Sequence, residues 1–315
     1  MIQSMYQVLR DSHSQWVPLR GCRYHVRHWG APLSELANGA TPLVLAHGWM
    51  DVAASWQFMV DALSEAFAQQ RPIIAMDWRG YGLTESPPTD SYWLPDYLGD
   101  LDALLDQLCP TQSIDLVGHS MGGNLVMMYT AARPERVRKL VNLEGFGLAA
   151  TRPAQAPGRM TEWLDALKDH RSGQHDLKPY PDAAKVAARL MKTNRRLPQD
   201  KADWLAQHWA QEGADGQWRI LGDSAHKVTN PYIFRVEETL EMYQRIRPAL
   251  LAVQASDDSL SQWWKGSYTL AEYHERLNSV PRVQREVVQD AGHMLHHDQP
   301  LALARLIEGF LSPAS

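Results

Sequence analysis

The sequence predicts an α/β fold in which a mostly parallel sheet is flanked by helices and carries a helical insertion. Two observations lead to this prediction. Short apolar runs alternate with helical patterns along most of the chain, as expected for repeated strand–helix–strand units. Residues 148–247, by contrast, contain helical stretches and several prolines but no convincing strand, and a segment of that length is too long to be a loop. We therefore expect one large domain with an inserted helical subdomain.

The elements of the first half can be placed in order. The predicted strands share a short apolar run that ends at a turn signal, and they cover 41–46, 72–76, 113–117 and 139–143. The predicted helices share apolar residues at helical spacing, and they cover 55–67, 92–108 and 124–132. Ser55 is a plausible N-cap for the first helix, and Pro134 ends the third.

The parallel pattern resumes after the insertion. We predict strands at 249–253 and 283–288, a helix at 270–277, and a final amphipathic helix at 301–311. The predicted domains are therefore a core of residues 1–147 and 248–315, and a helical cap of residues 148–247.

Charge and composition narrow the classes of partner. The chain has 31 lysines and arginines against 36 aspartates and glutamates, a net charge of −5 without a basic block, so we expect no nucleic-acid partner. No apolar run is long enough to span a membrane, and the polar N-terminus does not resemble a signal peptide. Cys22 and Cys109 are too few for a disulfide framework. We expect free thiols, a cytoplasmic location, and a monomer or homodimer that acts on a small molecule.

The strongest motif is Gly118-His119-Ser120-Met121-Gly122, which lies between a predicted strand and a predicted helix. A sharp strand–turn–helix connection presents its serine at the edge of a sheet, and glycines permit the close backbone packing of such a turn. The helix N-terminus also places partial positive charge where an oxyanion would form. Ser120 is therefore the candidate nucleophile.

A serine hydroxyl needs a base, and His293 is the best candidate among 13 histidines. It follows a predicted strand in Asp290-Ala-Gly-His293, where small residues leave the imidazole free to reach the sheet edge. His296 and His297 come soon after it, but the chain has no H-E-x-x-H motif and no cysteine partner for a metal site. We expect these two histidines to shape the pocket or the helix start, and we expect no metal and no cofactor.

An oxyanion hole needs two backbone N–H groups. Met121 directly follows the candidate nucleophile, and Trp49 follows His47-Gly48 at the end of the first predicted buried strand. These residues are the expected donors. His47, His119 and Trp263 are expected to line the substrate pocket.

The chain resembles the α/β-hydrolase superfamily, and within it the serine-hydrolase-like esterase branch. Four motifs occur in the order of that family: His47-Gly-Trp, Asp77-Trp-Arg-Gly-Tyr-Gly, Gly118-His-Ser-Met-Gly-Gly and Asp290-Ala-Gly-His. The resemblance covers 41–141 and 249–311. It implies the α/β-hydrolase fold with an eight-stranded, mostly parallel sheet and a helical cap between strands six and seven. It also implies a serine, acid and histidine in that order along the chain.

Two positions compete for the acid. The commoner superfamily position follows the strand at 249–253, where Asp258 lies in the better register. Glu144 follows the preceding core strand, a position that resembles the glutamate acid of some haloalkane dehalogenases. Adjacent aspartates make a normal solvated turn, whereas a glutamate at the mouth of a buried strand is costly unless it is paired. The sequence favours Glu144 and leaves Asp258 as the alternative.

These residues predict a serine hydrolase that cleaves carboxylic esters through an acyl-enzyme. The resemblance implies that members with an aspartate nucleophile, the haloalkane dehalogenases and epoxide hydrolases, are a different class. The size of the predicted cap and the 12 tryptophans favour small to medium apolar acyl groups. The alternatives on the same scaffold are a lactonase, a carbon–carbon bond hydrolase and a perhydrolase. A ligand-binding receptor with slow turnover is the alternative from another class.

Overall fold

The computed structural model describes residues 5–312, so the outermost residues of the predicted core, 1–4 and 313–315, lie outside it. Its main sheet has eight strands in the order β1-β2-β4-β3-β5-β6-β9-β10. The strands are β1 (His13–Leu19), β2 (Cys22–Gly30), β3 (Leu43–Ala46), β4 (Pro72–Met76), β5 (Ile114–His119), β6 (Val137–Leu143), β9 (Ala249–Ala255) and β10 (Val283–Val288). In this sheet, each neighbouring pair from β4 across β3, β5, β6 and β9 to β10 is parallel. Strand β2 pairs antiparallel with both β1 and β4. The predicted eight-stranded, mostly parallel sheet is confirmed.

The central strands could be predicted because both faces of the sheet are covered. Every residue of β3, β4 and β5 is buried, and the sequences of β3 and β4 are accordingly continuous apolar runs. The N-terminal hairpin of β1 and β2 was not predicted from its residues. In β2 the buried Tyr24 and Val26 stand among polar residues, and most of β1 is exposed, so neither strand forms an apolar run.

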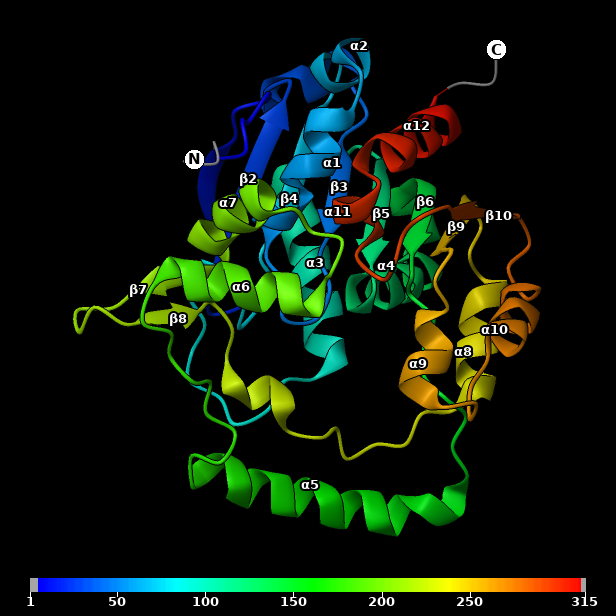
Figure 1. The fold of residues 1–315 in the computed structure, drawn as a ribbon. Coiled ribbons are helices and arrows are strands. Elements are labelled where there is room, and N and C mark those ends of the chain that lie inside the picture. Colours follow the sequence, from blue (N-terminus) through cyan, green and yellow to red (C-terminus); the bar gives the residue numbers. More distant parts are fainter. Residues whose placement is uncertain (1–4, 313–315) are drawn as a thin grey trace.

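Helices cover both faces of the sheet (Figure 1). One apolar core lies on each side of the sheet. The helices packed on the sheet are α1 (Gln57–Ala62), α2 (Glu65–Gln69), α3 (Leu94–Leu108), α4 (Met121–Ala132), α10 (Leu270–Leu277), α11 (Leu295–Asp298) and α12 (Pro300–Leu311). The predicted helix over 55–67 is divided in two, because Leu63 is extended and the Ser64 side chain accepts a hydrogen bond from the Phe67 N–H to begin α2. Cys22 and Cys109 are buried and not linked.

The chain between β6 and β9 forms the layer of helices that we call the cap segment, residues 148–247. It contains α5 (Ala156–Arg171), α6 (Ala183–Thr193), α7 (Gln199–Trp209) and α8 (Val236–Gln244). Figure 1 shows α6 and α7 close to the sheet domain, with α5 set apart from it. A short antiparallel hairpin, β7 (Ala210–Glu212) and β8 (Trp218–Ile220), lies in the cap segment, where we expected no strand. Strands this short carry no readable alternation.

The α6–α7 pair is anchored by a third apolar core. Val186, Ala202 and Leu205 of the cap segment pack with Val52 and Phe58 of the sheet domain. This contact fixes the cap segment beside the chain that follows β3. Within residues 5–312, no helix has both the length and the hydrophobicity needed to cross a bilayer.

Candidate active site

Ser120 occupies the tight turn that joins β5 to α4. Its backbone has φ 54° and ψ −116°, a conformation that a non-glycine residue adopts only at a cost of about 1–3 kcal/mol. The turn closes only because its neighbours are glycines. A Cβ at Gly122 would overlap the carbonyl oxygens of Ala46 and His47, and a Cβ at Gly118 would overlap the Gly122 backbone. This close packing holds the strained Ser120 turn at the carboxyl end of the sheet.

This close packing gives a stability prediction. Gly122→Ala will lower the free energy of unfolding by about 1–3 kcal/mol, because the new methyl group meets backbone that cannot rotate away. Urea denaturation of the purified proteins measures the change. Gly158→Ala is the matched control, because a Cβ at that position in α5 meets no atom within 4 Å beyond its chain neighbours and its own helix backbone. Equal midpoints for Gly122→Ala and the wild type would contradict the packing argument.

Ser120, His293 and Glu144 form one hydrogen-bonded series. Ser120 Oγ lies 2.9 Å from Nε2 of His293, and His293 Nδ1 lies 3.2 Å from Oε2 of Glu144. The other Glu144 oxygen accepts a hydrogen bond of 2.6 Å from the Ala255 N–H. Glu144 directly follows β6 and is 2 % exposed, so its carboxylate is fixed and buried. The structure thus brings Glu144 to the histidine.

The two aspartates after β9 are engaged elsewhere. Asp258 accepts hydrogen bonds from the Ser261 N–H at 2.8 Å and from the Ser261 hydroxyl at 2.5 Å, and so caps α9 (Ser259–Trp264). Asp257 forms a bidentate ion pair with Arg196 of the cap segment, at 2.6 and 3.1 Å. Neither carboxylate is directed at His293.

Burial controls the charge of this series. It lowers the pKa of His293 well below the usual value for histidine, and the nearby Asp51 carboxylate acts in the opposite direction. Burial likewise raises the pKa of Glu144. The resting imidazole is therefore neutral, which leaves Nε2 able to accept the Ser120 proton.

The lowered pKa of His293 predicts the acid side of the pH profile. A base works only when it is unprotonated, so protonation of His293 will reduce kcat/KM for the expected ester substrates only below pH 6.5, and a decline above that pH reports protonation of Glu144. Asp51→Asn removes the carboxylate that raises this pKa, so the decline will move to still lower pH. Initial rates between pH 4 and pH 9 measure both profiles. A decline that does not move in Asp51→Asn would contradict the prediction.

The predicted oxyanion donors lie on neighbouring strand ends. Met121 is the first residue of α4, where backbone N–H groups have no intrahelical acceptor. Trp49 follows β3, which pairs with β5. The Gly48 backbone packs so closely on Ser120 that a Cβ there would be 3.1 Å from the serine Cβ. The loop that carries Trp49 is therefore beside Ser120.

A cleft of about 1210 Å³ opens over Ser120, between the cap segment and the sheet. Trp263 and His119 both line it. The Trp263 ring is 4.3 Å from the His293 ring, and His119 Nε2 donates to the His293 carbonyl oxygen at 2.7 Å. The apolar part of the cap wall consists of Leu177, Leu190, Leu197, Leu205, Trp209 and Ile220.

The expectation that His47 lines the pocket is wrong. Its side chain is fully buried and is not part of the cleft wall. Nε2 accepts a hydrogen bond of 3.0 Å from the Trp78 N–H, and Nδ1 is 2.7 Å from the Gly48 carbonyl oxygen. His47 therefore holds two loops together beneath the site.

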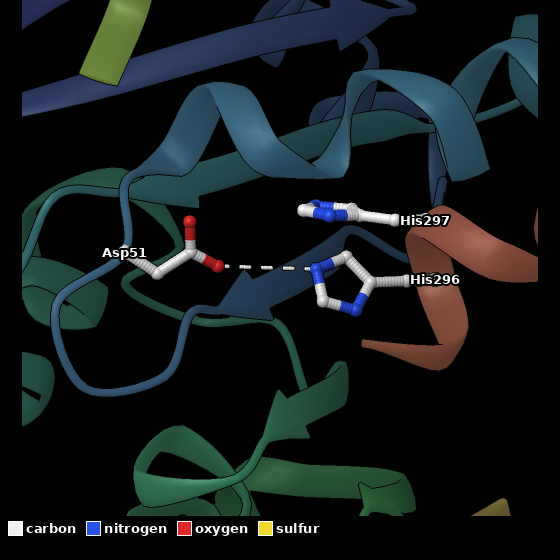
Figure 2. A group of neighbouring side chains, drawn as sticks. All are labelled: Asp51, His296 and His297. Atoms are coloured by element: carbon white, nitrogen blue, oxygen red, sulfur yellow. Dashed lines mark ion pairs between the residues drawn. The ribbon is translucent and has the colours of Figure 1, made fainter. Parts of the chain in front are cut away.

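A second polar group lies beside the series, and the sequence did not reveal it. Asp51, His296 and His297 each offer one potential metal-ligand atom, and these atoms are within 4.8 Å of one another (Figure 2). His296 and His297 belong to α11, whereas Asp51 follows β3, so nothing in the spacing of the residues indicates their contact. We call these three residues the Asp51 group. No other such group of three occurs in the part of the chain that the structure describes.

Comparisons with known proteins agree with this architecture. A family model described as the alpha/beta hydrolase fold matches residues 41–300. The serine hydrolase-like protein of Danio rerio is 24% identical over 315 aligned residues, which cover 95% of this chain and 87% of that protein. Esterase YbfF of Escherichia coli (strain K12) is 24% identical over 298 residues, covering 90% and 97%. A thioesterase domain from the curacin biosynthetic pathway superposes with a TM-score of 0.77 at 22% identity, covering 94% and 99%. The chain belongs to the alpha/beta hydrolase fold family.

Proposed function

We propose that this hydrolase cleaves carboxylic esters of small to medium acyl chain, with Ser120 as nucleophile and an acyl-enzyme as intermediate. The observation that supports it is the 2.9 Å approach of Ser120 Oγ to a buried His293 whose other nitrogen faces Glu144. This is the arrangement that turns a serine hydroxyl into a nucleophile. The similarity to an esterase of Escherichia coli points the same way.

The geometry defines the proposed steps. Ser120 Oγ attacks the ester carbonyl while its proton passes to His293 Nε2. The Trp49 and Met121 N–H groups hold the oxyanion, and Glu144 orients the imidazole and stabilises its positive charge. His293 then gives its proton to the leaving alcohol, and a water molecule repeats the sequence on the acyl-enzyme.

The walls of the cleft support apolar acyl groups. Trp263 stands next to His293, and leucine, isoleucine and tryptophan side chains of the cap segment face the same space. Removing the apolar acyl chain from water at these side chains favours binding by roughly 0.8 kcal/mol for each buried methylene group. We therefore propose that affinity rises with acyl length until the chain fills the cleft.

A p-nitrophenyl ester series from acetate to dodecanoate tests the proposal. We expect many turnovers per protein molecule and a maximum of kcat/KM at a short or medium chain. A lactonase, a carbon–carbon bond hydrolase or a perhydrolase would instead turn over its own substrates faster than any member of this series. A receptor would release about one nitrophenol per chain and then stop. Faster turnover of one of those other substrates, or release of only one nitrophenol per chain, would overturn the esterase proposal.

A further inference from the structure

The Asp51 group contains a buried polar atom without a partner among the described residues. Asp51 is 5 % exposed, and its Oδ2 atom accepts no hydrogen bond from any residue in the range 5–312. A buried, unpaired carboxylate oxygen costs several kcal/mol. A positively charged partner next to the Asp51 carboxylate would offset this cost.

The protein residues around Asp51 do not supply that partner. His296 Nε2 lies 3.9 Å from Asp51 Oδ2, beyond hydrogen-bonding distance. The Ser55 hydroxyl oxygen lies at the Nε2 atoms of both His296 and His297, and neither ring donates a hydrogen bond to Asp51 Oδ2. The nearby Lys201 ammonium is directed at the His297 carbonyl oxygen, 3.4 Å away, and at the Phe58 ring.

The potential ligand atoms converge on one point. Ser55 Oγ lies 3.1 Å from His296 Nε2 and 2.5 Å from His297 Nε2, and Figure 2 shows Asp51 and both rings gathered in one place. Ligand atoms around a tetrahedral zinc ion stand roughly 3.3 Å apart, because each is about 2.0–2.1 Å from the metal. The observed spacing needs only small side-chain movements to reach that geometry.

We propose that Asp51, His296 and His297 bind one divalent transition-metal ion of the zinc class, with the Ser55 hydroxyl or a water molecule as fourth ligand. Two imidazoles and a carboxylate are a ligand set that zinc accepts. Asp51 and His297 both line the cleft, so an ion can reach the site from the substrate side.

The position of this site predicts that the metal inhibits. This step rests on the proposed function, in which His293 becomes positively charged during catalysis, and the Asp51 carboxylate favours that charge. A dication on Asp51 reverses the local field and disfavours the imidazolium. The His119 ring lies between the proposed metal site and the catalytic series, with its centroid 4.5 Å from that of His296 and 4.7 Å from that of His293. Bound metal therefore lowers kcat reversibly.

Titration of chelator-treated full-length protein with Zn²⁺ in a calorimeter tests the site, and Co²⁺ absorption reports its geometry. We expect one tight ion per chain, a higher Tm, and a tetrahedral Co²⁺ spectrum. Asp51→Asn and His297→Gln should each weaken binding by more than about 100-fold. Circular dichroism checks that both variants fold, and if one does not, the other decides the test.

Two further variants separate this proposal from others. The double variant His170→Gln/His175→Gln removes two histidines of the cap segment whose ring centroids are 6.2 Å from each other. This variant should bind one ion as the wild type does. Ser120→Ala should also keep full metal affinity, so the binding result stands whether or not the protein is an esterase. Absence of a tight ion, undiminished binding in Asp51→Asn, or loss of the ion in the His170/His175 variant would overturn the proposed site.

Discussion

Ser120→Ala will lower kcat for ester hydrolysis by about 10⁴- to 10⁶-fold and will abolish labelling by a fluorophosphonate probe. Under the proposed mechanism, Ser120 Oγ is the atom that attacks the carbonyl, and alanine has no atom to replace it. The change removes a single oxygen and keeps the Cβ. The cost of the backbone conformation at φ 54° is therefore the same for serine and alanine at position 120, and the variant will fold. Steady-state rates on the preferred p-nitrophenyl ester and gel-based probe labelling measure the two effects.

The control for this experiment is a serine far from the series. Ser172 ends α5 and is exposed, so Ser172→Ala should keep the wild-type rate and the wild-type labelling. A Ser120→Ala protein that retained more than about a hundredth of the activity would show that another group attacks the ester.

The sequence predicts those elements whose surroundings restrict the residue types that they can contain. Strands such as β4 are buried on both faces, so their composition alone identifies them. The turn at Ser120 needs glycine on both sides of the serine for steric reasons, and this requirement is visible as a motif. The β1–β2 hairpin lies at the sheet edge, where polar residues are tolerated, and it has no such signature.

Side-chain direction is what the sequence could not supply. Glu144 and Asp258 both follow strands that end at the same edge of the sheet, and β6 pairs directly with β9. The choice between them depends on backbone conformation: Glu144 has φ 56° and faces His293, whereas Asp258 turns to cap α9. The Asp51 group was hidden for a related reason, since α11 and the loop after β3 meet only in the folded chain.

Glu144→Gln will lower kcat by about 1,000- to 10,000-fold, whereas Asp258→Asn will change it by no more than about a few-fold. Under the proposed mechanism, the Glu144 carboxylate accepts a hydrogen bond from the His293 Nδ1–H and stabilises the imidazolium. A glutamine amide is neutral, and its NH₂ group would favour the opposite tautomer, with Nδ1 unprotonated and Nε2 unable to act as base. Asparagine at 258 keeps the oxygen that accepts from the Ser261 N–H, so α9 remains capped.

Measuring kcat for the two variants side by side, on the same ester and at one pH, assigns the acid. The two substitutions are chemically matched, because each exchanges one carboxylate for its amide and leaves the volume unchanged. Circular dichroism of both variants shows whether a lost rate reflects unfolding rather than loss of the acid. Greater damage from Asp258→Asn would instead require α9 to release Asp258 during catalysis and would transfer the role of the acid to that residue.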